Sequence, residues 1–359
     1  DFTVYGDATD NTASENAESV SVNITSVASA QSTVYLRFRW TSRCYFWMLD
    51  DIRIVETPDN ELGFISPAFG GWHIGYSSTI GAGSDYTFYP LIQATAQPYR
   101  LEGVIKNTGA QTQNNVTMHV DVEENGNITP LSSTQISLSS SQNDTLTCLF
   151  SPTSTGPHNF NFSASSDSII TTDTTGRGTV VTDTVYGIDY DWASDGATAS
   201  GYAYLARANC GQVLGNIYDI FADDDLTSIS FHVSEESIVG AEVKVQVYED
   251  IEGSDPLLDK ESASFYKLTS QDIGSWVTLP LSASLFAGKS YVAAVKGAQH
   301  PTDTVGISTS SNDYFSGYTQ DNGCDIGTQG FGFWYSASSA KLIRMNFGSA
   351  SWVIAPPIS

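Results

Sequence analysis

Short runs of alternating apolar and polar residues, separated by turn signals, recur along most of this 359-residue chain. The clearest of them are SISFHVS, AEVKVQVYEDI, WVTLPLS and YVAAVKGA, all between residues 228 and 298. An alternation of period two is typical of a strand with one buried face and one solvent-facing side. We find no convincing helical pattern of any length. The sequence therefore predicts an all-β protein built of tandem β-sandwich domains.

One run, from Val34 to Glu56, joins two predicted strands through a short connection. Its first half alternates, with Val34, Leu36, Phe38 and Trp40 on one face and Tyr35, Arg37 and Arg39 on the other. Its second half is more continuously apolar but contains two adjacent acids, Asp50 and Asp51. Carboxylates so close to a core are expected to be paired, hydrogen-bonded or bound to a cation.

Composition narrows the range of functions. Acidic residues outnumber basic ones by 40 to 15, which gives a net charge of −25, while charged residues make up only 15% of the chain. Such a surface repels phosphate backbones and anionic membranes, so nucleic-acid binding and membrane insertion are not expected. No stretch approaches the ~20 apolar residues of a membrane helix. The abundance of Ser, Thr, Asn and Gly favours a secreted protein, although the opening residues, DFTVYGDATD, do not resemble a signal peptide.

Breaks in the strand pattern divide the chain into three units and a tail. Residues 1–57 hold about four predicted strands, too few for a sandwich, and are interpreted as the C-terminal part of a jelly roll. This interpretation predicts that the first part of that module was removed, went unobserved, or is supplied by another chain. Residues 58–182 predict an immunoglobulin-like sandwich with a hairpin turn at ENGN (124–127). Residues 183–350 predict a jelly-roll sandwich, and residues 351–359 a C-terminal tail.

The four cysteines are widely spaced and form no CxxC pair, which argues against a zinc site. Cys210 and Cys324 lie in two Gly-rich loops, ANCGQ and NGCDIG, that flank one predicted domain. The sequence is compatible with a disulfide between them or with two separate buried thiols.

Motifs of common catalytic sites are missing from the sequence. The five histidines are isolated, and neither HExxH nor GxSxG occurs. AGKS (287–290) ends like a phosphate-binding loop, but Ala283 stands where the first glycine is required, and the setting is a turn into a strand. The acids of DYDWASDG, which begins at Asp189, have the wrong spacing for an EF-hand and predict an acidic turn. Paired carboxylates brought together from distant strands remain open, but we predict that the chain is not an enzyme.

Several sequence segments resemble modules of secreted Bacteroidota surface proteins. FRWTSRCYFWMLDDIRIVE resembles the closing strands of cleaved-adhesin and MAM-like jelly rolls, whose pattern ends in an aromatic residue followed by IDDV. LEGVIKNTGAQTQNNVTMHVDV is similar to the opening of a CARDB-like immunoglobulin-type domain, and GNIYDI, WVTLPL and LFAGKSYVAAV resemble the jelly roll that often follows. RMNFGSASWVIAPPIS resembles the segment before a type IX secretion sorting domain. The resemblance implies a type IX secretion cargo that lacks its sorting domain.

The resemblance also implies a calcium site. Calcium commonly lies near the closing strand of the adhesin jelly rolls, which makes Asp50 and Asp51 candidate ligands and calcium the one expected cofactor. The alternative is that one carboxylate pairs with Arg37, Arg39 or Arg53 while the other faces solvent.

Bacteroidota O-glycosylation is a second implication of the resemblance. It occurs at an Asp followed by Ser or Thr and then an apolar residue. Here the matching acceptors are Thr145, Ser168, Thr184 and Thr304.

Aromatic residues gather in two Gly-rich stretches. The leading candidates for contacts with a ligand or partner are Trp72, Tyr76, Tyr318 and Trp334. Rings on sandwich loops stack on sugars or anchor protein partners; the alternative is that they pack between sheets and at domain joints.

These observations predict a non-catalytic adhesin, stalk or filament protein of the cell surface or extracellular space. Its expected partners are other surface proteins or glycans, with self-assembly by strand complementation as one mode. The alternative is an accessory or carbohydrate-binding region of a secreted peptidase or glycosidase whose catalytic domain lies upstream.

Overall fold

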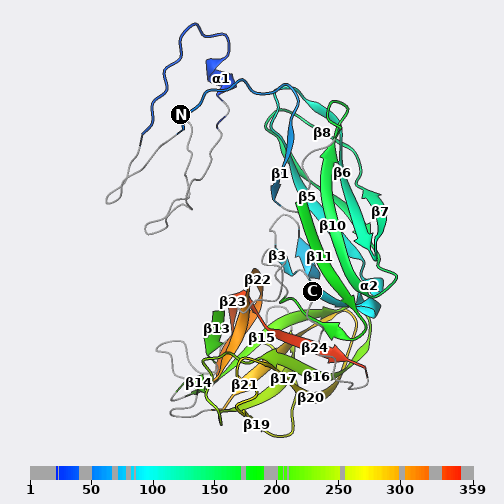
Figure 1. Ribbon diagram of the computed structural model, residues 1–359, viewed down its shortest axis with the longest axis vertical. Coiled ribbons are helices and arrows are strands. Elements are labelled where there is room, and N and C mark those ends of the chain that lie inside the picture. Colours follow the sequence, from blue (N-terminus) through cyan, green and yellow to red (C-terminus); the bar gives the residue numbers. More distant parts are fainter. Residues whose placement is uncertain are drawn as a thin grey trace.

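Two β-sandwiches lie end to end in the computed structural model of this chain (Figure 1). The structure describes residues 22, 24–39, 51–66, 72–77, 82–84, 86–170, 175–189, 201–204, 206–207, 210–250, 255–298, 304–322 and 334–348. Within these residues nearly all regular structure is strand, which confirms the predicted all-β class with tandem sandwiches.

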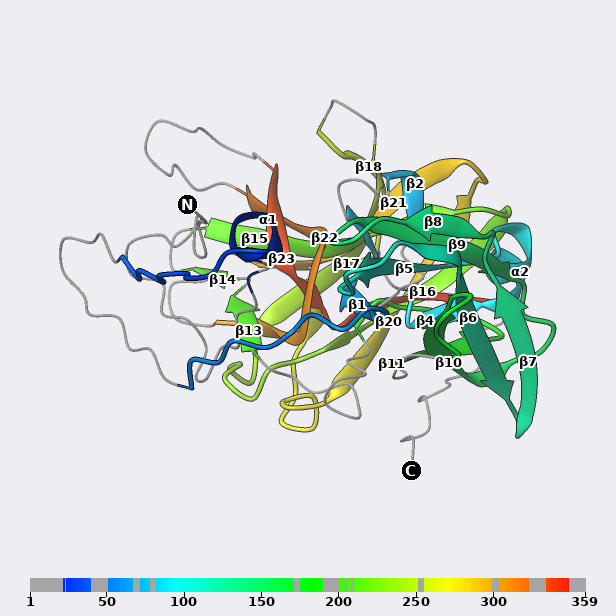
Figure 2. The same ribbon diagram turned by 90° about the horizontal axis from the view of Figure 1, so that it is seen from above.

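The first sandwich packs a three-stranded sheet against a six-stranded one. The smaller sheet has the order β1–β5–β9 (Figure 2), made of Leu62–Ser66, Tyr99–Asn107 and Asn143–Phe150. The larger has the order β4–β11–β10–β6–β7, with β8 beside β6; its strands are Phe88–Pro90, Thr175–Thr182, Gly156–Ser165, Gln113–Glu124, Asn127–Ser132 and Ile136–Leu138. Only the β4–β11 pair is parallel in these two sheets.

Side-chain alternation and turn chemistry explain these strands. In β10, Phe160 and Phe162 are buried while the asparagines between and before them are exposed, as a period of two requires. The hairpin predicted at 124–127 is confirmed: Asn125 and Gly126 have φ of 50° and 77°, and Glu124 pairs with Asn127. Positive φ at both central residues is the backbone of the type I′ turn, which Asn-Gly adopts readily.

The second sandwich packs a four-stranded sheet against a nine-stranded one. The smaller sheet has the order β12–β24–β16–β20, made of Val185–Tyr186, Ile343–Phe347, Asp224–His232 and Trp276–Leu285. The main path of the larger is β13–β22–β15–β21–β17–β18, made of Gly201–Tyr204, Gly306–Asn322, Cys210–Ile220, Lys289–Gly297, Glu242–Asp250 and Leu257–Glu261. Three further strands pair with β15, β17 and β22 respectively: β14 (Ala206–Arg207), β19 (Tyr266–Lys267) and β23 (Trp334–Lys341).

A hairpin of the first sandwich reaches the second. Strands β2 (Trp72–Ser77) and β3 (Ala82–Ser84) lie between β1 and β4 in sequence. They contact β15, β21 and β22 of the second sandwich.

Two short helices depart from the expectation of no helix. Helix α2, Leu91–Ala96, directly follows Pro90, the last residue of β4, whose φ of −60° and ψ of 135° are the extended backbone of an N-cap residue. Its sequence, LIQATA, contains good helix formers. Helix α1, Thr25–Ala28, is a single turn near the N-terminus.

The strands predicted in the run 34–56 are not formed in its described residues. Residues 34–39 and 51–56 belong to no strand, and all of their side chains are exposed; in Figure 1 they project from the outer end of the first sandwich. A strand is stabilised by hydrogen bonds to a neighbour, and among the described residues no strand lies beside this segment.

Candidate functional site at the junction of the sandwiches

The connection between the sandwiches is itself part of the β structure. Only two residues separate β11 of the first sandwich from β12 of the second. Two hydrogen bonds of Thr182 close this connection: its Oγ1 donates to Val185 O (2.5 Å) and accepts from Val185 N (3.0 Å). Two residues later Gly187 returns to the first sandwich: its N donates to Phe88 O (2.8 Å) and its O accepts from Phe88 N (3.0 Å). The connection is therefore held to the first sandwich at both ends.

Gly187 leaves space for this close approach. A Cβ at this position would lie 2.8 Å from Asp189 Oδ1 and 3.2 Å from atoms of both Phe88 and Arg344. Such distances are shorter than ordinary contacts, so only glycine fits without displacement of its neighbours.

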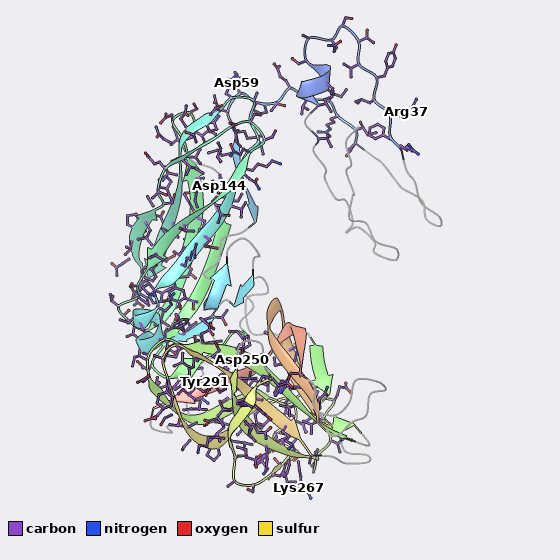
Figure 3. All side chains as sticks on the ribbon, turned by 180° about the vertical axis from the view of Figure 1, so that it is seen from behind. Arg37, Asp59, Asp144, Asp250, Lys267 and Tyr291 are labelled. Carbon is purple, nitrogen blue, oxygen red and sulfur yellow. The ribbon has the colours of Figure 1, made fainter. Side chains whose placement is uncertain are left out.

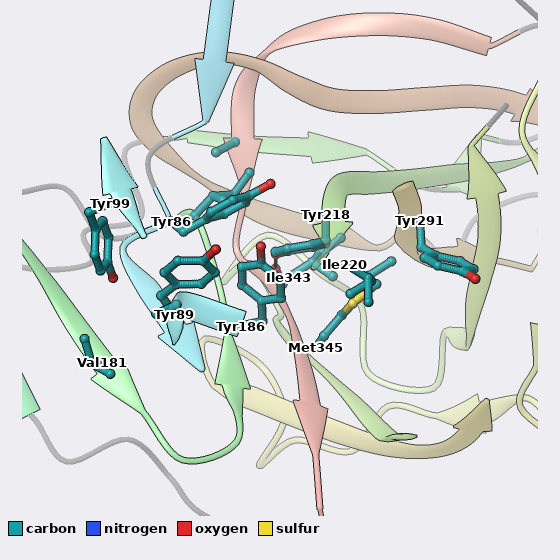
Figure 4. Close-up of a cluster of buried hydrophobic side chains, with 14 of the residues drawn as sticks. Tyr86, Tyr89, Tyr99, Val181, Tyr186, Tyr218, Ile220, Tyr291, Ile343 and Met345 are labelled. Atoms are coloured by element: carbon teal, nitrogen blue, oxygen red, sulfur yellow. Dashed lines mark hydrogen bonds between the residues drawn. The ribbon is translucent and has the colours of Figure 1, made fainter. Parts of the chain in front are cut away.

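A series of buried tyrosines crosses the junction (Figure 4). Tyr99, Tyr89 and Tyr86 come from the first sandwich, Tyr186 and Tyr218 from the second, and none is more than 2% exposed. Ring centroids are 5.2, 5.3 and 5.1 Å apart along the series Tyr99, Tyr89, Tyr186 and Tyr218, and Tyr86 lies 4.6 Å from Tyr186. These spacings are favourable for aromatic pairs. The series belongs to a single hydrophobic core that continues from one sandwich into the other.

The tyrosine hydroxyls bind backbone groups across the junction. Tyr186 Oη donates to Asp219 O (2.9 Å), while Asp219 N donates to Tyr86 Oη (3.2 Å). Burial raises the pKa of Tyr86 and Tyr186 well above the usual value, and the negative charge of Asp219 raises both further. The hydroxyls therefore stay protonated at neutral pH and act as hydrogen-bonding groups rather than as bases.

Gln93 of α2 forms a second tie between the sandwiches. Its side chain is fully buried, and its Nε2 donates to Ala222 O (2.9 Å). Its Oε1 accepts from Phe221 N (2.8 Å) and Ala222 N (3.0 Å). The amide thus satisfies three backbone groups of the turn between β15 and β16, as a neighbouring strand would.

Arg344 of β24 forms a third tie. Its guanidinium binds the fully buried Asp189 through Nε, 3.0 Å from each oxygen, and through Nη2, 2.7 Å from Oδ2. The guanidinium carbon lies 4.1 Å from the ring centroids of both Phe88 and Trp276. A cation from the second sandwich is therefore held between rings of both sandwiches.

The chemistry of this site is structural. Buried tyrosines, the Gln93 amide and the Arg344 guanidinium stacked on Phe88 fix the relative position of the two sandwiches, because each unmatched polar group would carry a desolvation cost. Among the described residues, no group of three or more His, Cys, Asp or Glu side chains could hold a metal ion. The described part of the chain also contains no helix that is long and apolar enough to cross a membrane.

The predicted calcium and disulfide sites remain predictions. Asp50 lies outside the described residues, and Asp51 is exposed with a φ of 50°. Cys210 begins β15, but its side chain and the whole of Cys324 lie outside what the structure describes.

The aromatic candidates lie on neighbouring strands of the second sandwich and on the hairpin that contacts it, whereas the glycosylation candidates are spread over the chain. Trp72 and Tyr76 lie on β2 and Tyr318 on β22, with side chains outside the described set. Trp334 is half-buried and packs edge-on against Tyr248, with 4.9 Å between centroids. Ser168 is exposed in the turn after β10, whereas the threonines are half-buried, at positions Thr145, Thr184 and Thr304.

Sequence reasoning missed the residues of the junction. The pattern of DYDWASDG predicts an acidic turn, yet its first acid, Asp189, is a buried partner of Arg344. One signal was present: in LIRMNF, Arg344 is a cation with apolar residues directly on both sides. Such a cation requires an anion nearby. Gln93 gave no comparable signal.

Neither a protein-family model nor a curated protein matches this chain. Among solved structures, similar chains include the secreted serine protease VesC from Vibrio cholerae, with 12% identity and a TM-score of 0.17, over 59% of this chain and 46% of that one. A SusE-like protein, BT2857, is 11% identical with a TM-score of 0.18, over 70% of this chain and 93% of that one. The first match thus spans less than half of the protease. Likenesses this weak carry no argument about function.

Proposed function

We propose that this chain is a non-catalytic structural or adhesive protein of the cell surface or extracellular space, in which the two sandwiches act as one rigid spacer. The observation that supports this is the junction: one hydrophobic core, a two-way backbone bridge between Phe88 and Gly187, and the stacking of Arg344 on Phe88 all cross it. Flexible multidomain chains are joined by linkers that few contacts cross. Here the contacts that cross are buried and directional.

The surface chemistry is compatible with this role. A net charge of −25 keeps the chain soluble and repels anionic membranes, while its low share of charged residues leaves Ser, Thr and Asn to cover the sheets. Extracellular calcium, surface proteins and glycans are the proposed partners of such a spacer.

Exposure on cells tests the location. Proteinase K added to intact cells of the native host should remove this chain, while a cytoplasmic marker stays intact. Protection of the chain until the cells are lysed would contradict a surface location.

The native gene product tests the role. Mass spectrometry of the protein isolated from its host should find further β modules attached to this chain, and micrographs should show extended particles. A catalytic domain on the same polypeptide would instead favour an accessory region of a secreted enzyme.

A further inference from the structure

We propose that the outer edge of β9 pairs with the same edge of a second copy, antiparallel and around a twofold axis at Cys148. The inference goes beyond the proposed function and does not depend on it, because it assigns the surface through which two copies meet.

The ladder between β5 and β9 determines which backbone groups of β9 face outward. Just before β9, Asn107 N donates to Gln142 O (2.9 Å), and the pairing continues along the eight residues of β9 without a shift in register. In an antiparallel ladder, hydrogen-bonded pairs alternate with non-bonded ones. Counted from Gln142, the even-numbered residues of β9 therefore bond to β5. The N–H and C=O groups that point to the outer side belong to Thr145, Thr147 and Leu149.

Asp144 marks where the open part of this edge begins. Its Oδ1 accepts from Thr145 N (2.8 Å), so the outward donor of Thr145 is already occupied. Figure 3 shows Asp144 on the part of the first sandwich that is remote from the second. At the other end of β9, Phe150 pairs with Tyr99 of the tyrosine series at the junction. The open edge therefore runs from this acid toward the junction.

Between these ends the edge is open and exposed. Among the described residues, none forms a hydrogen bond with the outward backbone groups of Thr147 or Leu149. Leu149 is 63% exposed although it is apolar. In Figure 2 this edge lies on the side away from β13, β14 and β23 of the second sandwich. The open edge spans residues 146–150, and Cys148 is its midpoint.

The other edge strands that the structure describes are protected. A proline, a lysine, an irregular register or short length protects an edge against the addition of a further strand. Strand β7 contains Pro130, β20 contains Pro280, and register shifts interrupt the pairing of β1, β18 and β23. The remaining edge strands have four residues or fewer, namely β4, β8, β12, β13, β14 and β19. Strand β9, NDTLTCLF, has none of these protections.

The open edge is complementary to itself. With the axis at Cys148, Thr147 of one copy pairs with Leu149 of the other, and each such pair exchanges two backbone hydrogen bonds. On the core side, Leu146 of one copy faces Phe150 of the other, and both belong to the core of the first sandwich. Apolar residues directly opposite one another stabilise a pair of strands. The pairing therefore satisfies the outward backbone groups and joins two apolar cores at their edges.

Charge determines where two copies of this chain can meet. Two chains of net charge −25 repel each other, so a contact between them requires a place with few acids. Strand β9 carries one charged residue, Asp144. The twofold axis places the two Asp144 residues at opposite ends of the pair, about 27 Å apart along the strands. The uncharged residues 146–150 lie between them.

The same axis brings two thiols together. Cys148 is a free cysteine, half-buried at the edge of the core. Its own N–H and C=O bond to β5, so the two Cys148 residues face each other as a non-bonded pair, with Cα atoms about 4.5 Å apart. A disulfide spans Cα distances of about 4.4–6.8 Å. An oxidant can therefore link the two copies while the strands stay paired.

Sedimentation of the full chain under reducing conditions, over a range of concentrations, tests the pairing. The unchanged chain should form a dimer and nothing larger, because a twofold contact closes on itself. Leu149→Lys should weaken this association by about tenfold or more, since it places a lysine from each copy at the paired edge. Leu257→Lys on β18 is the matched control: Leu257 is 59% exposed, and the change should alter association by less than about threefold.

Both variants replace exposed leucines, and urea unfolding checks that the sandwiches stay folded. A chain that stays monomeric, open-ended association, or equal effects of the two lysines would overturn the proposal. A monomeric chain with a rigid junction would refute the edge pairing and leave the spacer function standing, whereas a dimer with a flexible junction would do the reverse.

Oxidation of the unchanged chain locates the axis. Diamide joins two thiols through an S–S bond, takes up their two hydrogens and is thereby reduced to the hydrazine. Mass spectrometry of the digested product should find the peptide of Cys148 linked to a second copy of itself, a link that only two molecules can form. Burial raises the pKa of Cys148 to about 11, so chance collisions give this link slowly. Leu149→Lys should lower its yield about tenfold, and a dimer linked through other cysteines but not through Cys148 would contradict the axis.

Discussion

The tripeptide Thr-Val-Tyr occurs at residues 3–5, 33–35 and 184–186, and the two copies that the structure describes, at 33–35 and 184–186, differ in structure. Tyr186 is fully buried in β12, whereas Tyr35 is 91% exposed and belongs to no strand. The copy at 33–35 lies in the N-terminal segment, and the copy at 184–186 lies at the junction. Because the local sequence is the same, the difference comes from the surroundings.

Those surroundings can be named. Tyr186 pairs with Met345 of β24, lies against the rings of Tyr86 and Tyr218, and donates to Asp219 O. Residues 34–39 have the same alternation, but no described strand lies beside them. The comparison teaches that alternation selects an extended backbone, while a neighbouring strand and a core decide whether it becomes a sheet.

The largest expected difference is between the two tyrosines. Tyr186→Ala should lower the free energy of unfolding by about 3–5 kcal/mol, because it leaves a cavity in the shared core. Tyr35→Ala should change it by less than about 0.5 kcal/mol. Urea titrations of both variants measure the two values, and similar losses would show that the segment and the junction are packed alike.

The two arginines give a matched second pair. Arg344→Met should cost about 3–5 kcal/mol, because Asp189 is left buried without its partner. Arg37→Met should be close to neutral. The double variant Asp189→Leu with Arg344→Met should recover much of the loss, since it removes both charges. If the double variant is as unstable as the single one, the ion pair is not the cause.

Gly187 tests the close approach at the junction. Gly187→Ala should cost about 1–3 kcal/mol, because the new methyl group meets Asp189, Arg344 and Phe88. Gly63→Ala is the control, since a Cβ there meets nothing within 4 Å. Thermal unfolding of both variants checks the prediction, and a neutral Gly187→Ala would mean that the backbones are not held together.

His232 gives the smallest effect, a dependence on pH. Its Nδ1 forms a hydrogen bond with Ser308 Oγ (2.8 Å). Its ring lies against that of Trp276, and the Trp276 ring also contacts the guanidinium of Arg344. Burial lowers the pKa of His232, and the charge of Arg344 lowers it further against the opposing charges of Asp189 and Glu235. The unfolded chain thus binds this proton first as the pH falls, so His232 reduces stability from its unfolded pKa near 6.5 downward. Unfolding free energies between about pH 7.5 and 5 should fall more steeply for the unchanged chain than for His232→Gln; equal slopes would contradict this.

The fold class was predictable because the sequence signals of strands and hairpins lie within short segments of the chain. The turn at Asn125–Gly126 and the strands around Phe160 and Val245 follow from residues next to one another in sequence. The junction was not predictable in this way. Asp189 and Arg344 lie 155 positions apart, and Gln93 binds a turn 129 positions away. The strand predicted at residues 34–39 was wrong for the converse reason. The local pattern of these residues is clear, but a strand also requires a neighbouring strand, which the pattern does not reveal.

The central claim is that the two sandwiches move as one body. Single-molecule energy transfer between dyes on Asp121 of the first sandwich and Lys267 of the second, both exposed, tests it most directly. We predict one narrow distribution for the unchanged chain, broadened by Gln93→Leu, which removes the three hydrogen bonds to the second sandwich, and unaffected by Ile92→Gln on the exposed side of the same helix. A broad distribution in the unchanged chain, or one that Gln93→Leu leaves as narrow as before, would contradict a rigid junction.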